Sequence, residues 1–395
     1  MRIESLTLKN FKTFQDAHIA DIPRFCVIVG ANGTGKSTLF EVFGFLRDCL
    51  KHNVRQALDM HGKYREIVSR GHEDEDIVIE VQFRMPIADV ERLITYHLVI
   101  GLDDGKPIVK REILRYKRGS HGSPFHFLDF QRGNGYAIIN EEDFNKPDEK
   151  LSRENQTLDS PDILAIKGLG QFQRFRAASA FRQLIESWHV SDFHISAARG
   201  SKDAGYAEHL SVSGDNLPLV AQYLYENHND RFKEILDRMR DRIPGVSHVE
   251  AKSTEDGRLI LRFQDGAFKD PFIDRYVSDG TIKMFAYLVL LYDPDPHPLL
   301  CVEEPENQLY PQLMAELAEE FRLYSNRGGQ VFVSTHSPDF LNASELDEVL
   351  WLVKKDGFTE IHRANADEQI RQYMQDGDQM GYLWKQGFFE GADPR

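Results

Sequence analysis

One stretch constrains this chain more than any other: Gly30–Thr38, with the sequence GANGTGKST. The apolar run Phe25–Val29 before it is typical of a buried strand, and Leu39–Phe43 after it has the pattern of a helix. A strand, the pattern G-x-x-x-x-G-K-S and a helix, in that order, form the setting of a phosphate-binding P-loop. Glycines let the backbone wrap around phosphates, and the helix N-terminus offers them N–H groups. The sequence therefore predicts a nucleotide site here.

The polar residues of this loop have different expected tasks. The ammonium group of Lys36 is expected to reach the β- and γ-phosphates, and the hydroxyl of Ser37 to coordinate Mg²⁺. Backbone N–H groups are expected to hold the remaining phosphate oxygens. The residues expected to bind the nucleotide are Asn32, Gly33, Thr34, Gly35, Lys36, Ser37 and Thr38.

Composition limits the classes of protein to which the chain can belong. Its 395 residues suffice for roughly two or three domains with a sizeable core. The net charge of −15 argues against a uniformly basic nucleic-acid surface, although it leaves room for a local basic groove. Cys26, Cys49 and Cys301 have no zinc or disulfide spacing, so we expect reduced thiols and a cytoplasmic protein. The longest apolar run, residues 284–292, is too short to cross a bilayer, so we expect no membrane association.

The order of periodic segments divides the chain into four regions. Residues 1–117 hold the P-loop and strands that suggest an antiparallel sheet, and residues 118–265 are expected to form an inserted lobe, loop first and then mostly helical. Strand–helix–strand order returns in residues 266–365, which indicates a doubly wound α/β core. Residues 366–395 are a tail whose aromatic end, 381–389, is expected to dock on the protein's own core. Helices in the second region are expected at 172–188, 217–227 and 231–242.

Two strand ends in the third region carry residues suited to hydrolysis. The apolar run Leu299–Val302 is followed by Glu303, expected to support Mg²⁺ through its water shell, and Glu304, expected to polarise the attacking water. After the next apolar strand comes His336, which is expected to hydrogen-bond the γ-phosphate or that water. The expected catalytic residues are thus Glu304, His336 and Lys36, and the expected metal ligands are Ser37 and Glu303.

A second anion site is expected at the start of the apolar helix 282–291. The turn Val277–Thr281 (VSDGT) precedes this helix and contains Ser278 and Gly280. Free N–H groups and the helix dipole at such a turn attract anions. A helix that is merely capped by serine would have the same pattern, so both interpretations stay open.

Together and in this order, these motifs resemble the ATP-binding-cassette (ABC) head of the RecF, SMC and OLD-type ATPases. Leu6–Phe14 is similar to the opening of that group, Glu304–Pro311 to the end of its Walker B motif with the D-loop, and Ser334–Pro338 to its His switch. Val277–Thr281 occupies the position of the signature motif. The resemblance implies an α/β P-loop NTPase fold with a mixed or doubly wound sheet, an antiparallel β subdomain and an inserted α-rich subdomain.

The resemblance, which covers about residues 1–90 and 270–365, also implies a function. Proteins of this group hydrolyse ATP with Mg²⁺, and the signature of one subunit contacts the γ-phosphate held by the P-loop of another. ATP is therefore expected to join copies of this chain into a homodimer or a higher homo-oligomer that acts as a switch or clamp. DNA maintenance or anti-phage defence is the implied setting, with DNA and a separate effector or nuclease chain as possible partners.

Two positions depart from the pattern of that group, and one of its motifs is not placed. Asp279 stands in the signature where glycine is usual and brings a negative charge near the expected phosphate. Glu303 replaces the more common aspartate and is one methylene longer. The Q-loop glutamine has two candidates, Gln82 and Gln171, and neither has a distinguishing pattern.

Other functions stay open on the sequence alone. The chain could be an ATPase sensor that gates a separate nuclease or toxin effector, or a scaffold that binds ATP without turnover, which Glu304 disfavours. A transporter subunit is disfavoured by the long, strand-rich stretch between Lys36 and Ser278. Two clusters of metal-binding residue types, 189–194 and 293–297, are interpreted as loops.

Overall fold

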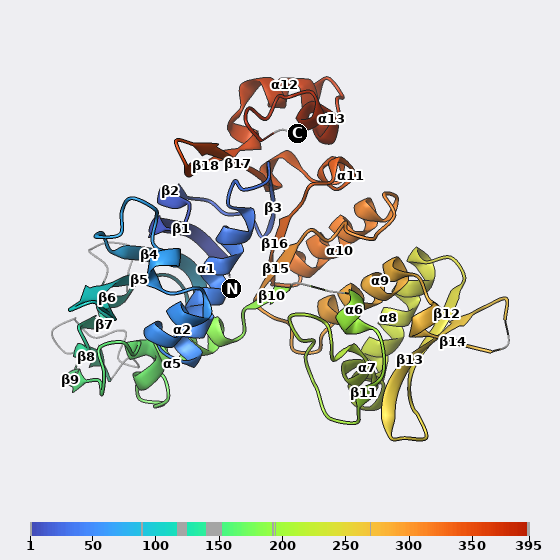
Figure 1. Cartoon of the computed structure of the whole chain (residues 1–395), viewed down its shortest axis with the longest axis horizontal. Helices are drawn as coiled ribbons and strands as arrows, with labels where there is room; N and C mark the ends of the chain where they lie inside the picture. Colours follow the sequence, from blue (N-terminus) through green and yellow to red (C-terminus); the bar gives the residue numbers. More distant parts are fainter. Residues whose placement is uncertain are drawn as a thin grey trace. The chain divides into compact units, whose positions relative to one another are not determined.

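The computed structural model describes residues 2–87, 90–116, 125–139, 152–191, 193, 195–268 and 270–392 (Figure 1). The chain divides into two compact units. Unit 1 comprises Met1–Trp188, Leu346–Asp378 and Leu383–Arg395, and unit 2 comprises His189–Glu345 and Gln379–Tyr382. Among the described residues, no helix is both long and apolar enough to cross a membrane.

An antiparallel sheet of eight strands dominates the described part of unit 1, in the order β2-β1-β4-β5-β6-β7-β8-β9. Alternate residues of β4, from Ile77 to Phe83, are buried, which is the pattern of a sheet with one face on a core. The predicted antiparallel sheet is therefore confirmed. Its strands are β1 (Arg2–Phe11), β2 (Phe14–Ile19), β4 (Ile77–Ile87), β5 (Val90–Asp103), β6 (Lys106–Tyr116), β7 (Phe125–Gln131), β8 (Asn134–Ile138) and β9 (Arg153–Thr157).

The P-loop strand β3 (Phe25–Gly30) is also in unit 1. It pairs in parallel with β17 (Val349–Lys355), which pairs antiparallel with β18 (Phe358–Arg363), so this sheet is mixed as predicted.

Phe181 of α5 (Arg176–Glu186) stacks on Phe83 of the antiparallel sheet, with ring centroids 4.7 Å apart. The other helices of this region are α1 (Lys36–Lys51), α2 (Val54–Met60), α3 (Tyr64–Ile67) and α4 (Ala165–Leu169).

Helix α5 is shorter than the sequence predicts. The spacing of apolar residues predicts a helix over 172–188, but the structure has successive turns first, with Phe172 N–H bonded to Leu169 O and Phe175 N–H bonded to Phe172 O. Phe172 is also exposed. Helical spacing before Arg176 thus reflects a tight turn and not a buried helix face.

The C-terminal segment of unit 1 packs on its own core, as the aromatic pattern predicts. Phe389 is fully buried and meets Trp351 of β17 edge-on, with ring centroids 5.1 Å apart. Trp384 is buried as well, and its Nε1 donates to the carbonyl of Ala392 over 2.7 Å. The elements toward this end of the chain are η4 (Leu346–Glu348), η5 (Ala364–Ala366), α12 (Glu368–Gln375) and α13 (Met380–Lys385).

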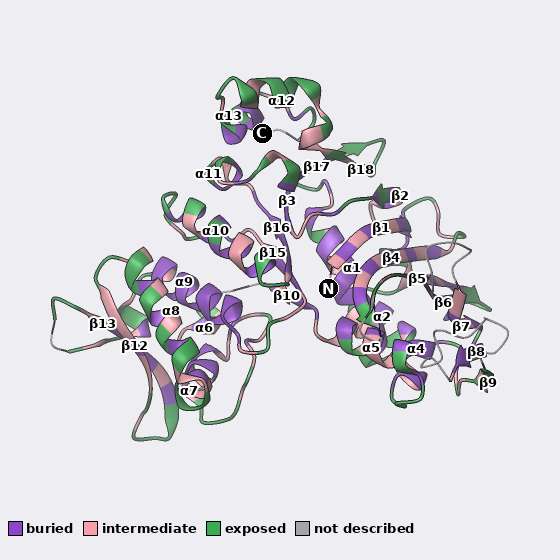
Figure 2. Cartoon of the chain, turned by 180° about the vertical axis from the view of Figure 1, so that it is seen from behind, coloured by how far each residue is buried: buried purple, intermediate pink, exposed green. Residues whose placement is uncertain are grey.

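Unit 2 contains three parallel strands, among its described residues, in the order β10 (His189–Ser191), β15 (Leu299–Glu303) and β16 (Gln330–Ser334). Residues 299–302 and 330–334 are all buried, which explains the continuous apolar runs in the sequence. Helix α9 (Asp279–Leu291) is buried along almost its whole length, as the purple ribbon in Figure 2 shows. The remaining α-helices are α6 (Ile195–Ala198), α7 (Leu217–Asn227), α8 (Asn229–Arg242), α10 (Leu313–Asn326) and α11 (Pro338–Asn342).

A second, smaller antiparallel sheet in unit 2 runs β11-β13-β12, with β14 beside β13. Helices α7 and α8 pack against it, and α7 agrees with the predicted helix at 217–227, while α8 begins two residues before the predicted start. The strands are β11 (Lys202–Asp203), β12 (Val246–Ser253), β13 (Arg258–Asp265) and β14 (Phe272–Ile273), followed by η3 (Asp274–Tyr276).

Candidate active site

The predicted P-loop connects β3 to α1 in unit 1. Gly35, directly before α1, has a φ of +100°, in the left-handed region that favours glycine. A Cβ atom at this position would lie 2.7 Å from Thr13 Oγ1 and 2.8 Å from Thr359 Oγ1. Both the torsion and the close neighbours therefore require glycine here, as expected of a loop that wraps a phosphate.

Lys36 is held over the loop by the loop's own backbone. Its Nζ donates to the carbonyl oxygens of Gly30 (2.8 Å) and Ala31 (3.1 Å), and the residue is buried. The N-cap of α1 is Gly35, which has no side chain to cap the helix, and the first turn of α1 contains no acidic residue. The positive end of the helix dipole and the Lys36 ammonium thus lie at the same loop, which suits a polyphosphate.

Two threonines that sequence reasoning missed support this loop. The hydroxyl of Thr359 in β18 lies 2.8 Å from Thr34 O and 2.8 Å from Thr13 Oγ1, and its N–H donates to Thr13 O over 2.8 Å. Thr359 is buried. No local pattern could have revealed this support, because the two threonines are brought together from opposite ends of the chain.

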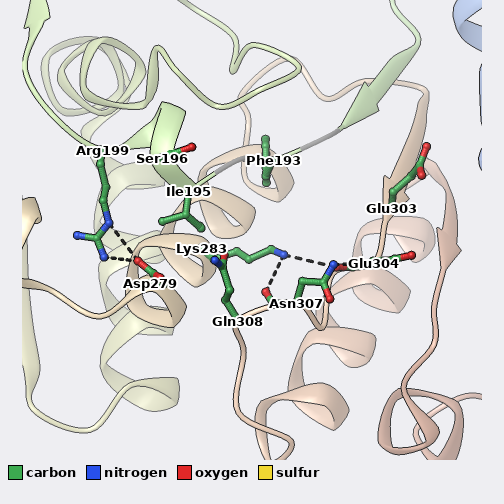
Figure 3. A pocket seen from close by; sticks show the side chains of 10 residues that line it. All are labelled: Phe193, Ile195, Ser196, Arg199, Asp279, Lys283, Glu303, Glu304, Asn307 and Gln308. Atoms are coloured by element: carbon green, nitrogen blue, oxygen red, sulfur yellow. Dashed lines mark hydrogen bonds and ion pairs between the residues drawn. The ribbon is translucent and has the colours of Figure 1, made fainter.

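The predicted Walker B carboxylates lie at the end of β15 in unit 2. Glu304 follows the strand with a φ of +41°, and its N–H donates to Ser334 O of β16 over 2.9 Å. A left-handed conformation costs a residue with a side chain roughly 1–3 kcal/mol, so the surrounding contacts must hold this turn. Figure 3 shows the side chains of Glu303 and Glu304 diverging from this turn.

His336 and Glu304, which the sequence assigns to the same reaction, are neighbours in unit 2. His336 Nε2 lies 3.3 Å from Glu304 Oε1, and Asn307 Nδ2 donates to Glu304 Oε2 over 2.9 Å. Both Glu304 and His336 are partly exposed, so a substrate can reach them. A carboxylate held on both oxygens in this way is suited to polarise a water molecule.

The D-loop after Glu304 holds this pair in place. Glu306 Oε1 accepts the backbone N–H of His336 over 2.5 Å, and burial raises the pKa of the Glu306 carboxyl above its usual value. Lys283 of α9 is buried, and its Nζ donates to the carbonyl oxygens of Asn307 (2.8 Å) and Glu304 (3.4 Å). Sequence reasoning missed Lys283, although a lysine inside the apolar helix 282–291 was an available signal.

The signature turn forms the N-terminus of α9. Ser278 is the N-cap, and its Oγ accepts the N–H of Thr281 over 3.2 Å. At Gly280 a Cβ atom would lie 2.9 Å from Gln308 O, so glycine allows the D-loop to approach the helix. The capped-helix interpretation is therefore confirmed, and anion binding at Ser278 and Gly280 stays a prediction.

The carboxylate of Asp279, which departs from the signature pattern, is paired with Arg199. Arg199 Nε donates to Asp279 Oδ1 over 3.1 Å, and Nη2 also contacts this oxygen. The same guanidinium donates to Val277 O over 2.7 Å and to Asp274 O. Arg199 thus neutralises the negative charge that Asp279 brings to the signature turn.

A polar cavity of about 730 Å³ lies beside these residues in unit 2. Its lining includes the Arg199–Asp279 pair on one side and Glu303, Glu304 and Asn307 on the other, with Lys283 between them (Figure 3). Charged side chains of both signs thus line the cavity, and Phe193 and Ile195 add apolar surface to it.

The expected metal ligands fit Mg²⁺ in their chemistry. Ser37 offers a hydroxyl oxygen in unit 1 and Glu303 a carboxylate oxygen in unit 2, and Mg²⁺ prefers oxygen ligands.

Of the Q-loop candidates, Gln82 lies in β4 and Gln171 is exposed, both in unit 1. Neither is distinguished further, and the Q-loop assignment stays a prediction.

Comparison with known proteins supports the assignment of these motifs to one fold. The chain resembles an SMC head bound to the C-winged helix domain of ScpA with a TM-score of 0.53 and 16% identity, over 92% of this chain and 97% of that one. At this identity the likeness concerns the fold alone. The predicted α/β P-loop fold of an ABC-type head is confirmed.

Curated relatives match in short segments. The DNA replication and repair protein RecF of Renibacterium salmoninarum is 38% identical over 56 residues, which is 14% of each chain. RecF of Clavibacter michiganensis subsp. michiganensis is 28% identical over 120 residues, 29% of this chain and 27% of that protein. The chain thus matches less than a third of the length of these relatives.

Two family models match the chain itself. Residues 5–186 match a family described as "AAA domain". Residues 109–342, more than half of the chain, match a family described as "AAA domain, putative AbiEii toxin, Type IV TA system". With a P-loop in unit 1 and a Walker B end, signature turn and His switch in unit 2, the chain belongs to this AAA-domain ATPase family and has an ABC-type head.

Proposed function

We propose that this protein hydrolyses ATP to ADP and phosphate in a Mg²⁺-dependent reaction. The observation that carries the proposal is the geometry of Glu304, whose carboxylate lies 3.3 Å from His336 Nε2 and accepts the Asn307 amide over 2.9 Å. Glu304 acts as the general base that polarises the attacking water. His336 hydrogen-bonds the γ-phosphate or that water, and this role explains its position at the tip of β16.

The P-loop binds the triphosphate in this reaction. Lys36 exchanges its two carbonyl acceptors for phosphate oxygens, and the amides of residues 32–38 hold the β-phosphate. Mg²⁺, when bound, neutralises charge on the β- and γ-phosphates. Ser37 would hold the ion through its hydroxyl, and Glu303 would support it through its carboxylate.

ATP joins two copies of the chain in this proposal. The signature turn of one copy, with Ser278 and Gly280, contacts the γ-phosphate held by the P-loop of the other. The N-terminus of α9 attracts that phosphate because the Arg199 guanidinium offsets the charge of Asp279. The dimer then serves as a cytoplasmic switch that ATP binding closes and hydrolysis opens.

The biological setting follows from the relatives. The match to RecF supports a role in DNA maintenance with DNA as a partner. The family description, which names a putative AbiEii toxin and a Type IV TA system, supports a second candidate: an ATPase subunit that gates a separate toxin or nuclease effector in anti-phage defence. A scaffold that binds ATP without turnover is the alternative if hydrolysis is absent.

The experiment is a phosphate-release assay combined with light scattering, with and without Mg-ATP. Glu304→Gln is expected to lower turnover about 100-fold or more, as loss of a general base does, and to accumulate a dimer with ATP. Glu319→Gln, an exposed position on α10, is the matched control and is expected to behave like the wild type. Ser278→Arg is expected to prevent the dimer. Equal turnover in Glu304→Gln would refute the catalytic assignment, and an unchanged monomer mass would refute the switch.

A further inference from the structure

Three side chains of metal-binding types meet in unit 2, away from the residues discussed above. His209 precedes α7, Asp293 follows the end of α9, and His297 precedes β15. One ring nitrogen of each histidine and one carboxylate oxygen of Asp293 all lie within 4.8 Å of one another. We propose that these three side chains bind one divalent transition-metal ion, for which Zn²⁺ is the best match.

The carboxylate of Asp293 is already oriented toward the histidines. Its side chain is only 3% exposed, so its charge needs a partner. Asp293 Oδ1 accepts the N–H of Asp295 over 2.9 Å, which leaves Oδ2 directed at His209 Nδ1, 2.8 Å away. A bound cation would replace the proton shared by this pair.

The backbone beneath both histidines is fixed. Tyr324 Oη donates to the carbonyl of His297 over 2.5 Å, and Asn216 Nδ2 donates to the carbonyl of His209 over 2.9 Å. Between Asp293 and His297, two prolines at positions 294 and 296 restrict the loop further. Little conformational entropy is therefore lost when the three ligands bind an ion.

The ligand set selects the kind of metal. Imidazole nitrogen and carboxylate oxygen suit Zn²⁺ and similar ions, whereas Mg²⁺ prefers oxygen alone. Zinc bonds of about 2.0–2.2 Å place the ligand atoms of a tetrahedral site roughly 3.3–3.6 Å apart. The three ligand atoms here lie within 4.8 Å of one another, so side-chain rotations that move them by about 1 Å would complete the geometry. His209 is 39% exposed, which gives solvent access for a water molecule as the fourth ligand.

The location gives the ion a structural consequence. Helix α9 begins at the signature turn, where Arg199 holds Asp279, and ends just before Asp293. The segment after Arg199 continues to His209. A metal bound by His209 and Asp293 would therefore connect this segment to the C-terminal end of α9. The Arg199–Asp279 ion pair connects the same segment to the N-terminal end.

A binding titration on the full chain tests the proposal. The protein is freed of metal with a chelator and titrated with Zn²⁺, and separately with Co²⁺ followed by visible absorption, in excess Mg²⁺ and without nucleotide. One ion per chain is expected. His209→Gln and Asp293→Asn are expected to weaken Zn²⁺ binding by at least about 10–100-fold. Losses of this size follow even when only a hydrogen-bond partner of a metal ligand is removed. His52→Gln, an exposed histidine of unit 1, is the control and is expected to leave binding unchanged.

A second measurement does not depend on the variants folding. Diethylpyrocarbonate modifies accessible histidines, and mass spectrometry of the wild-type peptides reads the modified positions. Zn²⁺ is expected to protect His209 and His297 and to leave His52 reactive. The proposal would be overturned if the wild type did not bind Zn²⁺. It would also be overturned if both ligand variants bound Zn²⁺ as tightly as the wild type and Zn²⁺ did not protect His209 and His297. The cluster would then be a hydrogen-bonded His–Asp pair.

Discussion

Arg199 and Asp279 form an ion pair at the start of the signature helix, with Arg199 Nε 3.1 Å from Asp279 Oδ1. The guanidinium also donates to the carbonyl of Asp274 in η3 and to that of Val277 in the signature turn. The negative charge of Asp279 is thereby neutralised by the guanidinium. The departure from the usual signature glycine is therefore compensated within unit 2.

Removal of this arginine is expected to weaken ATP-driven assembly. In a Glu304→Gln background, Arg199→Gln leaves Asp279 uncompensated, and we expect the dimer to dissociate about tenfold more readily, which corresponds to ~1.4 kcal/mol. Light scattering at graded protein concentrations measures this change. Adding Asp279→Asn is expected to restore part of the loss, and Arg258→Gln, which breaks an exposed ion pair with Asp203, serves as the control. Assembly that is insensitive to Arg199→Gln would contradict the proposed role.

Gly35→Ala is expected to abolish ATP binding while the chain still folds. The new Cβ would lie within 2.8 Å of two threonine hydroxyls and would occupy a left-handed conformation, so the loop must shift. Gly328→Ala is a matched control, since Gly328 has a φ of +109° but no neighbour within 4 Å. We expect the control to lose about 1–2 kcal/mol of stability and to bind ATP normally. Fluorescent-nucleotide titration together with thermal unfolding separates the two effects.

Asn307→Ala is expected to lower kcat about tenfold with little change in KM. The Asn307 amide holds one oxygen of Glu304 but is not expected to bind ATP, so its loss affects the general base and not substrate affinity. Steady-state kinetics of phosphate release measure both constants. Gln312→Ala, at an exposed position before α10, is the control. A rise in KM with unchanged kcat would instead place Asn307 in nucleotide binding.

Glu112 is expected to make the stability of the protein depend on pH. Burial raises the pKa of its carboxyl to about 7, although the N–H groups of Ala165 and Ile166 and the hydroxyl of Tyr96 oppose this shift. Because the folded pKa lies above the value of 4.5 for an exposed glutamate, the folded state binds the proton more tightly. The stabilisation is fully present below pH 4.5 and is lost as the pH rises through about 7.

Urea unfolding between pH 4.5 and 8 measures this effect. Glu112→Gln cannot ionise, so we expect its unfolding free energy to fall less across this range than that of the wild type. Glu368→Gln, an exposed residue of α12, should retain the wild-type slope. Parallel slopes for the wild type and Glu112→Gln would show that other groups cause the pH dependence.

The sequence by itself determined the strand–loop–helix at Gly30–Thr38, the strand that ends in Glu303 and Glu304, and the aromatic pattern of the tail, residues 381–389. These features are local: the spacing of glycines and of apolar runs encodes them within about ten residues. The same local pattern misplaced the start of α5, because Phe172 has helical spacing but is exposed.

Only the tertiary structure decided which distant residues complete these motifs. Arg199 meets Asp279 from 80 residues away, and Thr359 meets Thr13 from 346 residues away. Lys283 looks like an anomaly in an apolar helix until the carbonyls of Asn307 and Glu304 are seen to accept its protons. Such pairs depend on how strands and helices pack, because a buried charge or hydroxyl takes whichever partner the fold brings within hydrogen-bond distance.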